Sequence, residues 1–109
     1  LNERLLVREA GSGTREMLER KLKEKNLTLN DFSHKVEIGN LNTIKKMVCA
    51  GAGISFFYQP VVQQELDQGI LREITLNDFS ANHEFNFIWR KNSIYKDIYH
   101  EIYTMLGKA

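Results

Sequence analysis

The chain has 109 residues, 42% hydrophobic and 27% charged, which is typical of one globular domain or part of one. Its formal net charge of +1 lacks the basic excess that direct binding of a nucleic-acid backbone would require. No stretch approaches the roughly 20 apolar residues of a membrane helix, and the first ten residues lack a signal-peptide pattern. We therefore expect a cytoplasmic protein with no membrane partner. A lone cysteine, Cys49, excludes an intramolecular disulfide and a two-cysteine metal or redox pair.

The chain begins with an apolar run followed by a helical pattern. Residues 4–9 are expected to form a strand, and a glycine-containing break follows. The helix predicted from about Thr14 to Lys25 has acidic residues early and basic residues late. This order stabilises a helix because each charge lies near the end of the helix dipole with the opposite sign. Its apolar side carries Met17, Leu18 and Leu22.

Two further strand–helix units follow. A strand at residues 34–39 precedes a helix that Asn40 caps and Gly51 ends, with an apolar side of Leu41, Ile44, Met47 and Val48. The apolar run at 53–59 is typical of a strand buried on both faces. One helix is expected after it, with Pro60 in its first turn, Val62 and Leu66 on one side, and Gly69 at its end. Three such units predict an α/β fold with an open, mostly parallel sheet and helices on both faces.

The pattern changes after Gly69. An apolar run at residues 70–76 is followed by a polar connection and by a second run at residues 84–90. This second run is predicted to be a return strand with Phe85, Phe87 and Trp89 on one face, and we expect it to leave the first sheet. A last helix, capped by Ser93, carries a broad apolar side made of Ile94, Tyr95, Ile98, Tyr99, Ile102, Met105 and Leu106. So broad a side requires more partner surface than this chain supplies.

The loops at residues 11–14, 39–43 and 58–60 are expected at one edge of the sheet, where helix N-termini present unpaired N–H groups. The first loop lacks the lysine of a nucleotide phosphate loop, and Glu16 replaces the third glycine of a dinucleotide fingerprint. Two interpretations remain. In one, Gly11 and Gly13 supply positive φ and Ser12 or Thr14 only caps the helix. In the other, the same hydroxyls and amides bind a small polar or anionic ligand.

Catalysis and metal binding have little support in the sequence. Ser12 and Thr14 are not part of a nucleophile elbow. His34, His83 and His100 show no ligand spacing with one another or with the cysteine. We expect no catalytic residue, no metal, no cofactor and no enzymatic activity.

Three blocks of the sequence, in this order and spacing, resemble the effector-binding domain of LysR-type transcriptional regulators. The residues that carry the resemblance are Arg8, Glu9, Gly11, Ser12, Gly13, Thr14 and Arg15, then Gly39, Asn40, Ile44, Val48, Gly51, Gly53, Ile54 and Ser55, then Gly69, Leu71 and a return strand ending at Arg90.

The resemblance implies a two-lobed fold like that of periplasmic binding proteins, with a small effector held between the lobes. Residues 1–80 would form the second lobe, and residues 81–109 would supply a return strand and C-terminal helix that pack on the first lobe. DNA would be contacted only through a helix-turn-helix outside this chain, in a homo-oligomeric regulator. Members that sense peroxide use two cysteines in this lobe, which Cys49 alone does not supply.

Effector contacts carried over from the family fall on all three loops. They are Gly11, Ser12, Gly13, Thr14, Arg15, Asn40, Leu41, Asn42, Tyr58 and Gln59. In many members a proline follows the third strand sooner than Pro60 does here, so this wall of the pocket is expected to differ.

Three functions compete on this sequence. The first is a sensor module that binds a small metabolite or anion and performs no reaction. The second is a non-regulatory solute-binding domain, which would require export and a signal peptide rather than a helix-turn-helix. The third is a phosphoryl-transfer enzyme built on the loop at residues 11–14, against which the missing lysine and magnesium ligands argue.

Overall fold

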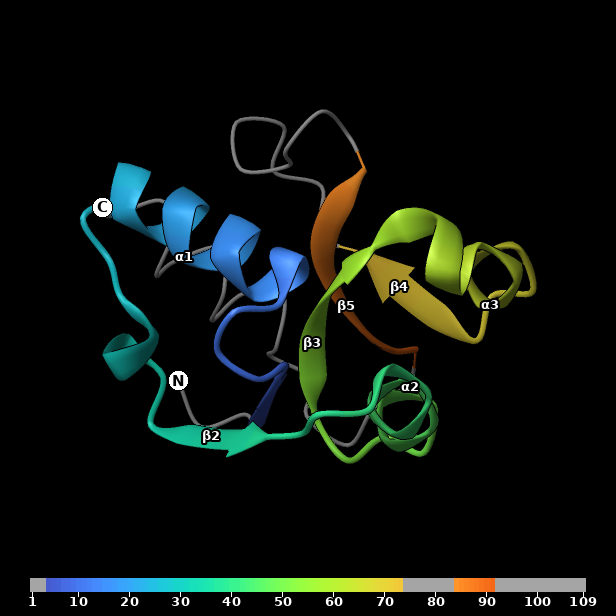
Figure 1. Ribbon diagram of the computed structural model, residues 1–109. Coiled ribbons are helices and arrows are strands. Elements are labelled where there is room, and N and C mark those ends of the chain that lie inside the picture. Colours follow the sequence, from blue (N-terminus) through green and yellow to red (C-terminus); the bar gives the residue numbers. More distant parts are fainter. Residues whose placement is uncertain (1–3, 74–83, 92–109) are drawn as a thin grey trace.

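The computed structural model describes residues 4–73 and 84–91, which contain one five-stranded sheet in the order β2-β1-β3-β5-β4 (Figure 1). Its strands are β1 (Arg4–Val7), β2 (His34–Glu37), β3 (Ile54–Tyr58), β4 (Leu71–Glu73) and β5 (Phe85–Arg90). Strands β2 and β3 lie parallel to β1 on either side of it, whereas β5 is antiparallel to both β3 and β4. The fold is therefore α/β with a mixed sheet.

Strand β5 lies inside this sheet, between β3 and β4, so the prediction that it leaves the sheet is wrong. Both of its faces are buried. Phe87 and Trp89 pack on one side of the sheet, as predicted, and Ile88 packs on the other. The neighbours β3 and β4 pair with both edges of β5, and helices cover both faces of the sheet, whereas the aromatic alternation indicated only one buried face. The predictions for His83, His100 and the helix beginning at Ser93 lie outside the described residues.

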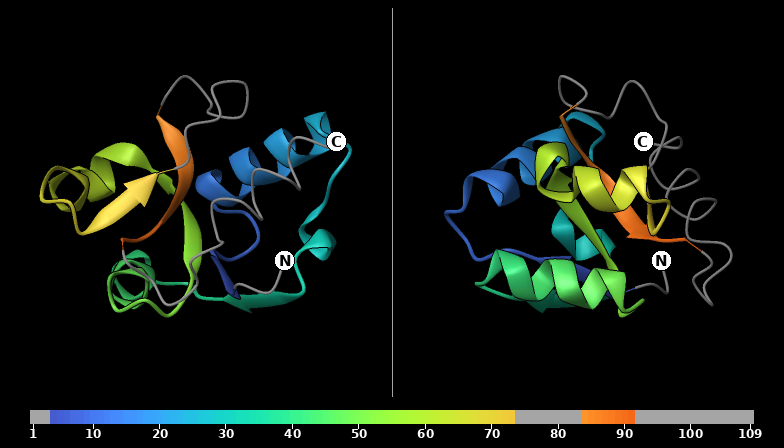
Figure 2. Two further views of the ribbon diagram at one scale, coloured as in Figure 1. Left: turned by 180° about the vertical axis from the view of Figure 1, so that it is seen from behind. Right: turned by 90° about the vertical axis from the view of Figure 1, so that its right-hand side faces the viewer.

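Helices cover both faces of the sheet (Figures 1 and 2). Helix α1 (Gly13–Glu24) packs Leu18 and Leu22 on one face, and α2 (Leu41–Cys49) packs Ile44 and Val48 on the other. The second face is also covered by the 3₁₀ helix η2 (Gln59–Val62) and by α3 (Gln63–Asp67). A further 3₁₀ helix, η1 (Leu29–Asp31), precedes β2. No helix in the described ranges is long and apolar enough to cross a membrane.

The predicted caps of the first two helices are confirmed. The Ser12 Oγ accepts a hydrogen bond from the N–H of Arg15 at 3.1 Å, and the Asn40 Oδ1 accepts one from the N–H of Thr43 at 3.0 Å. Each side chain satisfies one of the N–H groups that the first turn of a helix leaves unpaired. Gly51, with φ of +79°, follows α2 as predicted.

The segment after Pro60 is two short helices rather than the single helix predicted. Val62 has φ of −118°, outside the α-helical range, so η2 ends there and α3 begins at the next residue. The side chain of Val62 is fully buried in the core under α2 and α3. The helical spacing of the apolar residues Val62 and Leu66 does not reveal this break.

Candidate functional site

The chain segments that follow β1, β2 and β3 lie at one edge of the sheet, because these three strands are adjacent and parallel. The first two segments are in contact. The N–H of Ile38 donates to the carbonyl of Val7 at 2.8 Å, which extends the pairing of the two strands. A Cβ placed on Gly39 would lie 3.7 Å from the Glu9 carboxylate. The starts of α1 and α2 therefore lie at the same edge of the sheet. They carry most of the predicted ligand residues.

The loop after β1 is a tight turn. The N–H of Ser12 donates back to the carbonyl of Glu9 at 3.2 Å, and Gly11 has φ of +93°, which glycine adopts without strain. Gly13 does not share this conformation, contrary to the prediction, because it is already the first residue of α1. The turn and cap interpretation is thus correct for Gly11 and Ser12, and it leaves ligand binding by the same loop open.

Two helix N-termini present unpaired N–H groups at this edge. Within the described chain, the N–H groups of Gly13 and Thr14 in α1 have no hydrogen-bond partner, and neither do those of Leu41 and Asn42 in α2. The first turn of each helix also carries the positive end of the helix dipole. Together these groups form an edge of donors suited to a small anion or to an oxygen-rich ligand.

Arg15 is held by groups of the protein itself. Its Nη1 donates to the carbonyl of Arg8 at 3.1 Å and to the Glu37 carboxylate at 2.8 Å, and its Nε donates to Glu19 at 3.0 Å. These carboxylates, Glu19 first, raise the pKa of Arg15 above its ordinary value. The guanidinium therefore fixes the loop after β1 to the end of β2, and this positioning role is one that the sequence did not indicate.

A second ion pair lies on the same loop. The Nε of Arg8 donates to the Glu9 carboxylate at 2.9 Å, and this hydrogen bond lowers the pKa of Glu9 below its ordinary value. Neither residue is among the predicted ligand contacts, although both lie in the block that resembles the family. Glu37 was missed altogether, because a carboxylate on an exposed edge strand has the pattern of an ordinary solvated surface.

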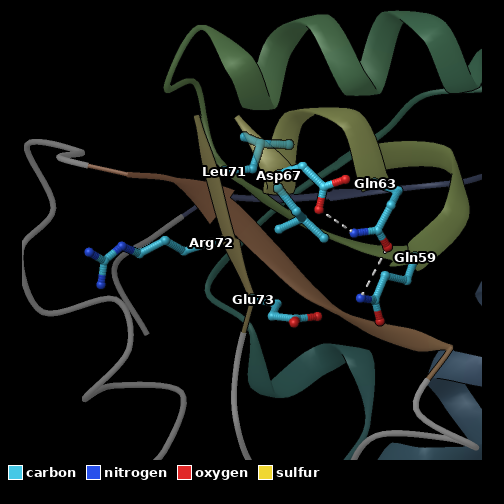
Figure 3. A pocket seen from close by; sticks show the side chains of 7 residues that line it. Gln59, Gln63, Asp67, Leu71, Arg72 and Glu73 are labelled. Atoms are coloured by element: carbon cyan, nitrogen blue, oxygen red, sulfur yellow. Dashed lines mark hydrogen bonds between the residues drawn. The ribbon is translucent and has the colours of Figure 1, made fainter. Parts of the chain in front are cut away.

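Tyr58 and Gln59, the third predicted group, make their contacts with β5 and α3. Tyr58 is 39% exposed, and its ring lies 5.1 Å from the ring of Phe85, measured between centroids. The N–H of Gln59 donates to the carbonyl of Glu84. Its side chain lines a pocket of about 410 Å³ that reaches across α3 to β4 (Figure 3). This group lies at the same edge of the sheet as the first two, but the pocket that Gln59 lines contains no residue of those two groups.

The described residues offer little for catalysis or metal binding. They contain no group of three or more histidine, cysteine, aspartate or glutamate side chains that could hold a metal ion. Cys49 is half-buried near the end of α2, and burial raises the pKa of its thiol.

The family model described as "LysR substrate binding domain" matches residues 1–95. The HTH-type transcriptional regulator CbbR of Xanthobacter flavus is 43% identical over 70 residues, which are 64% of this chain and 20% of that protein. The regulator of the same name from Sinorhizobium medicae is 42% identical over 74 residues, covering 63% and 21%. An uncharacterized HTH-type regulator of Escherichia coli K12, YeiE, is 37% identical over 71 residues, covering 65% and 23%.

The chain thus spans about a fifth of the length of the curated relatives that it matches. No solved structure matches it. The family match covers all five strands and the helices between them, and it falls among transcriptional regulators rather than enzymes. The chain therefore belongs to the LysR substrate-binding domain family.

Proposed function

We propose that this chain is the effector-sensing part of a LysR-type transcriptional regulator and that it binds a small metabolite or inorganic anion without transforming it. The ligand would be held by the first turns of α1 and α2, through the residues Gly11, Ser12, Gly13, Thr14, Asn40, Leu41 and Asn42. Arg15 would support this site by holding the loop after β1 in place. Tyr58 and Gln59 would form its far wall.

The observation that carries the proposal is the pair of helix N-termini with unpaired N–H groups at one sheet edge. One helix N-terminus favours a nearby negative charge by about 0.3–1 kcal/mol, and by up to about 2 kcal/mol where the geometry is partly buried. Two such termini facing one ligand would add their contributions. Hydroxyl groups of Ser12 and Thr14 lie beside them. Ordinary surface turns do not combine these features.

In the complete protein, this second lobe would face the first lobe in the manner of periplasmic binding proteins. An effector that binds the closed arrangement of the lobes more tightly than the open one would shift the population toward the closed form. The shift would alter the geometry of a homo-oligomer and, through a helix-turn-helix outside this chain, its contacts with DNA in the cytoplasm. Regulation would then be a coupling free energy between the effector site and the DNA site.

The second lobe in this proposal extends through β5, beyond the boundary near residue 80 that the sequence suggests. The reason is that β5 pairs with both β3 and β4. Only the sequence after Lys91 is then left for the return to the first lobe. The relatives carry a helix-turn-helix by name, and this favours a regulator over an exported solute-binding protein.

A thermal-shift screen of the complete encoded protein tests the proposal. The panel contains sulfate, phosphate, amino acids and small carboxylates. A ligand at about one hundred times its dissociation constant adds roughly 2.7 kcal/mol to the stability of the folded protein. The expected result is a rise in melting temperature with at least one class of ligand.

Two variants locate the site. Thr14→Val removes a hydroxyl at the start of α1 while keeping the shape of the side chain, and it is expected to weaken the response. Ser33→Ala is the matched control, because this exposed hydroxyl directly precedes β2 and so lies at the opposite edge of the sheet. No response to any ligand, or the same response in both variants, contradicts the proposed site.

A further inference from the structure

The side chain of Lys45 contacts two other helices on its face of the sheet. Lys45 belongs to α2, and its side chain is 30% exposed. Its Nζ donates a hydrogen bond of 3.0 Å to the carbonyl of Val61 in η2, and it forms an ion pair of 2.9 Å with the Oε1 of Glu65 in α3. One ammonium group therefore joins α2 to both of the short helices that follow β3 (Figure 1).

The ion pair is largely removed from water. The Glu65 side chain is 12% exposed, and its Oε1 is buried. Such a pair is costly to break, because removal of one partner leaves the other charge uncompensated in a poorly solvated place. The Lys45 ammonium is therefore held between α2 and α3, whereas the ammonium of an exposed lysine gains little from any one ion pair and remains free to move.

The hydrogen bond to Val61 lies at the break between η2 and α3. Val62 is the last residue of η2, and its φ of −118° is outside the helical range. In the described part of the chain, the Lys45 ammonium donates the one hydrogen bond between α2 and η2. The remaining contacts between them are those of apolar side chains in a shared core, which are not directional. Lys45 therefore supplies the directional contact that relates the two helices.

This contact connects two parts of the candidate ligand site. The first turn of α2 contains Leu41 and Asn42, whose N–H groups are unpaired, and Lys45 lies about one helical turn after Leu41. The helix η2 begins with Gln59, two residues before the Val61 carbonyl. The pocket that Gln59 lines contains no residue of α2, so the two parts do not share a wall. Their separation depends on the contacts between α2 and η2.

We propose that Lys45 is a positioning residue for the effector, because it sets the separation between the start of α2 and the start of η2. The inference rests on the proposed function and deepens it. A small inorganic anion held by the starts of α1 and α2 would not depend on this separation. An organic acid with a second polar group would depend on it, because that group must reach Gln59 while the first stays at α2. Lys45 would thereby select organic acids with a matching spacing of polar groups.

Titration calorimetry of the complete protein tests this role with two kinds of probe. Sulfate and phosphate are short, whereas succinate, glutarate and glutamate carry a second polar group at a distance from the first. Lys45→Met removes the ammonium and keeps a long side chain. We expect it to weaken the tightest of the three organic probes about three- to tenfold, the range of one net hydrogen bond, and the inorganic anions by less than about twofold.

Two further variants separate positioning from charge and from stability. Lys46→Met removes the same charge from the next position of α2, where the side chain is exposed, and is expected to change every affinity by less than about twofold. The double variant Lys45→Met/Glu65→Leu leaves no carboxylate unpaired, so its melting temperature is expected to lie near that of the native protein. The Val61 carbonyl still lacks its donor, and we therefore expect the same selective loss for the organic probe.

The contact is also measurable without a ligand. The N–H of Val62 shares a peptide group with the Val61 carbonyl. In ¹⁵N-labelled protein, Lys45→Met is expected to shift the backbone amide signals of both Val62 and Gln59. Lys46→Met is expected to shift neither signal. A shift at Val62 without one at Gln59 would mean that other contacts place the start of η2, and it overturns the proposal.

The binding results separate the role of Lys45 from the proposed function. If none of the five probes binds the native protein, the proposed function fails and the role of Lys45 fails with it. Binding of the inorganic anions alone defeats only the role of Lys45. The same holds if Lys45→Met weakens organic and inorganic probes equally or weakens neither, or if Lys46→Met reproduces the selective loss.

Discussion

Replacing Gly53 with alanine tests how the sheet that carries the candidate site is assembled. Gly53 is buried just before β3, where the chain passes beside β1. A Cβ at this position would lie 2.6 Å from the carbonyl oxygen of Arg4 and 3.3 Å from the Cγ of Leu6. The nearer atom belongs to the backbone of β1, so it cannot rotate away. Gly53→Ala must therefore push β1 and β3 apart.

The size of the effect follows from overpacking. Forcing an extra carbon into a packed core costs about 1–3 kcal/mol. Alanine offsets about 0.4–1 kcal/mol by restricting the unfolded chain. Because the clash is with backbone, we expect a net loss of about 2 kcal/mol in the free energy of unfolding. For a domain of this size, that loss lowers the melting temperature by roughly 8–16 °C.

Urea denaturation and calorimetry measure this loss, and Gly13→Ala is the matched control. A Cβ on Gly13 meets no atom within 4 Å, and the residue is the first of α1, so this variant is expected to be as stable as the native chain or slightly more stable. Equal stability of the two alanine variants would refute the close packing of β1 against β3.

Three further predictions concern single groups. Ser12→Ala and Asn40→Ala each remove a helix cap and are expected to lower the free energy of unfolding by about 1 kcal/mol in urea denaturation, whereas no loss would contradict the capping hydrogen bonds. The pKa of Glu9 lies below its ordinary 4.5, chiefly because of the hydrogen bond from Arg8, so this pair stabilises the folded chain above about pH 4.5 and the contribution is lost as the pH falls through the lower folded value. A carbon-detected NMR titration of Glu9 checks the sign, and a midpoint at or above 4.5 would contradict it. Burial raises the pKa of the Cys49 thiol above 9.0, so alkylation by iodoacetamide is expected to have its midpoint above that pH, and fast alkylation near pH 7 would contradict the burial.

Local features of this fold could be predicted from the sequence. The caps at Ser12 and Asn40 depend on residues within three positions of one another, and the turn at Gly51 depends on one backbone angle. The buried strand β3 follows from an apolar run on both faces. The rule for open parallel sheets predicted that the three loops lie at one edge, and the family resemblance added the expectation that they contact an effector.

Features set by distant parts of the chain could not be predicted in the same way. The position of β5 depends on pairing with β3 and β4, and the apolar pattern of a strand does not specify its neighbours. The contact between Arg15 and Glu37 joins residues from two different strand–helix units, so no spacing rule reveals it. The break at Val62 likewise results from its burial in the assembled core.

The central claim is that unpaired backbone N–H groups at the start of α1 bind the effector, and two variants at one position test it most directly. Proline at the first position of a helix deletes the N–H while keeping the helical backbone. Ser12 has φ of −70° and ψ of 145°, a conformation that a following proline allows. Alanine at Gly13 keeps the N–H and meets no atom within 4 Å.

Titration calorimetry of the complete protein, with the tightest ligand of the screen, compares Gly13→Pro with Gly13→Ala. The alanine variant is expected to bind like the native protein, and the proline variant roughly 10- to 150-fold more weakly, the loss of one hydrogen bond to a charged group at about 1.5–3 kcal/mol. Equal affinity of the two variants at equal thermal stability would contradict the claim that this edge of the sheet holds the ligand.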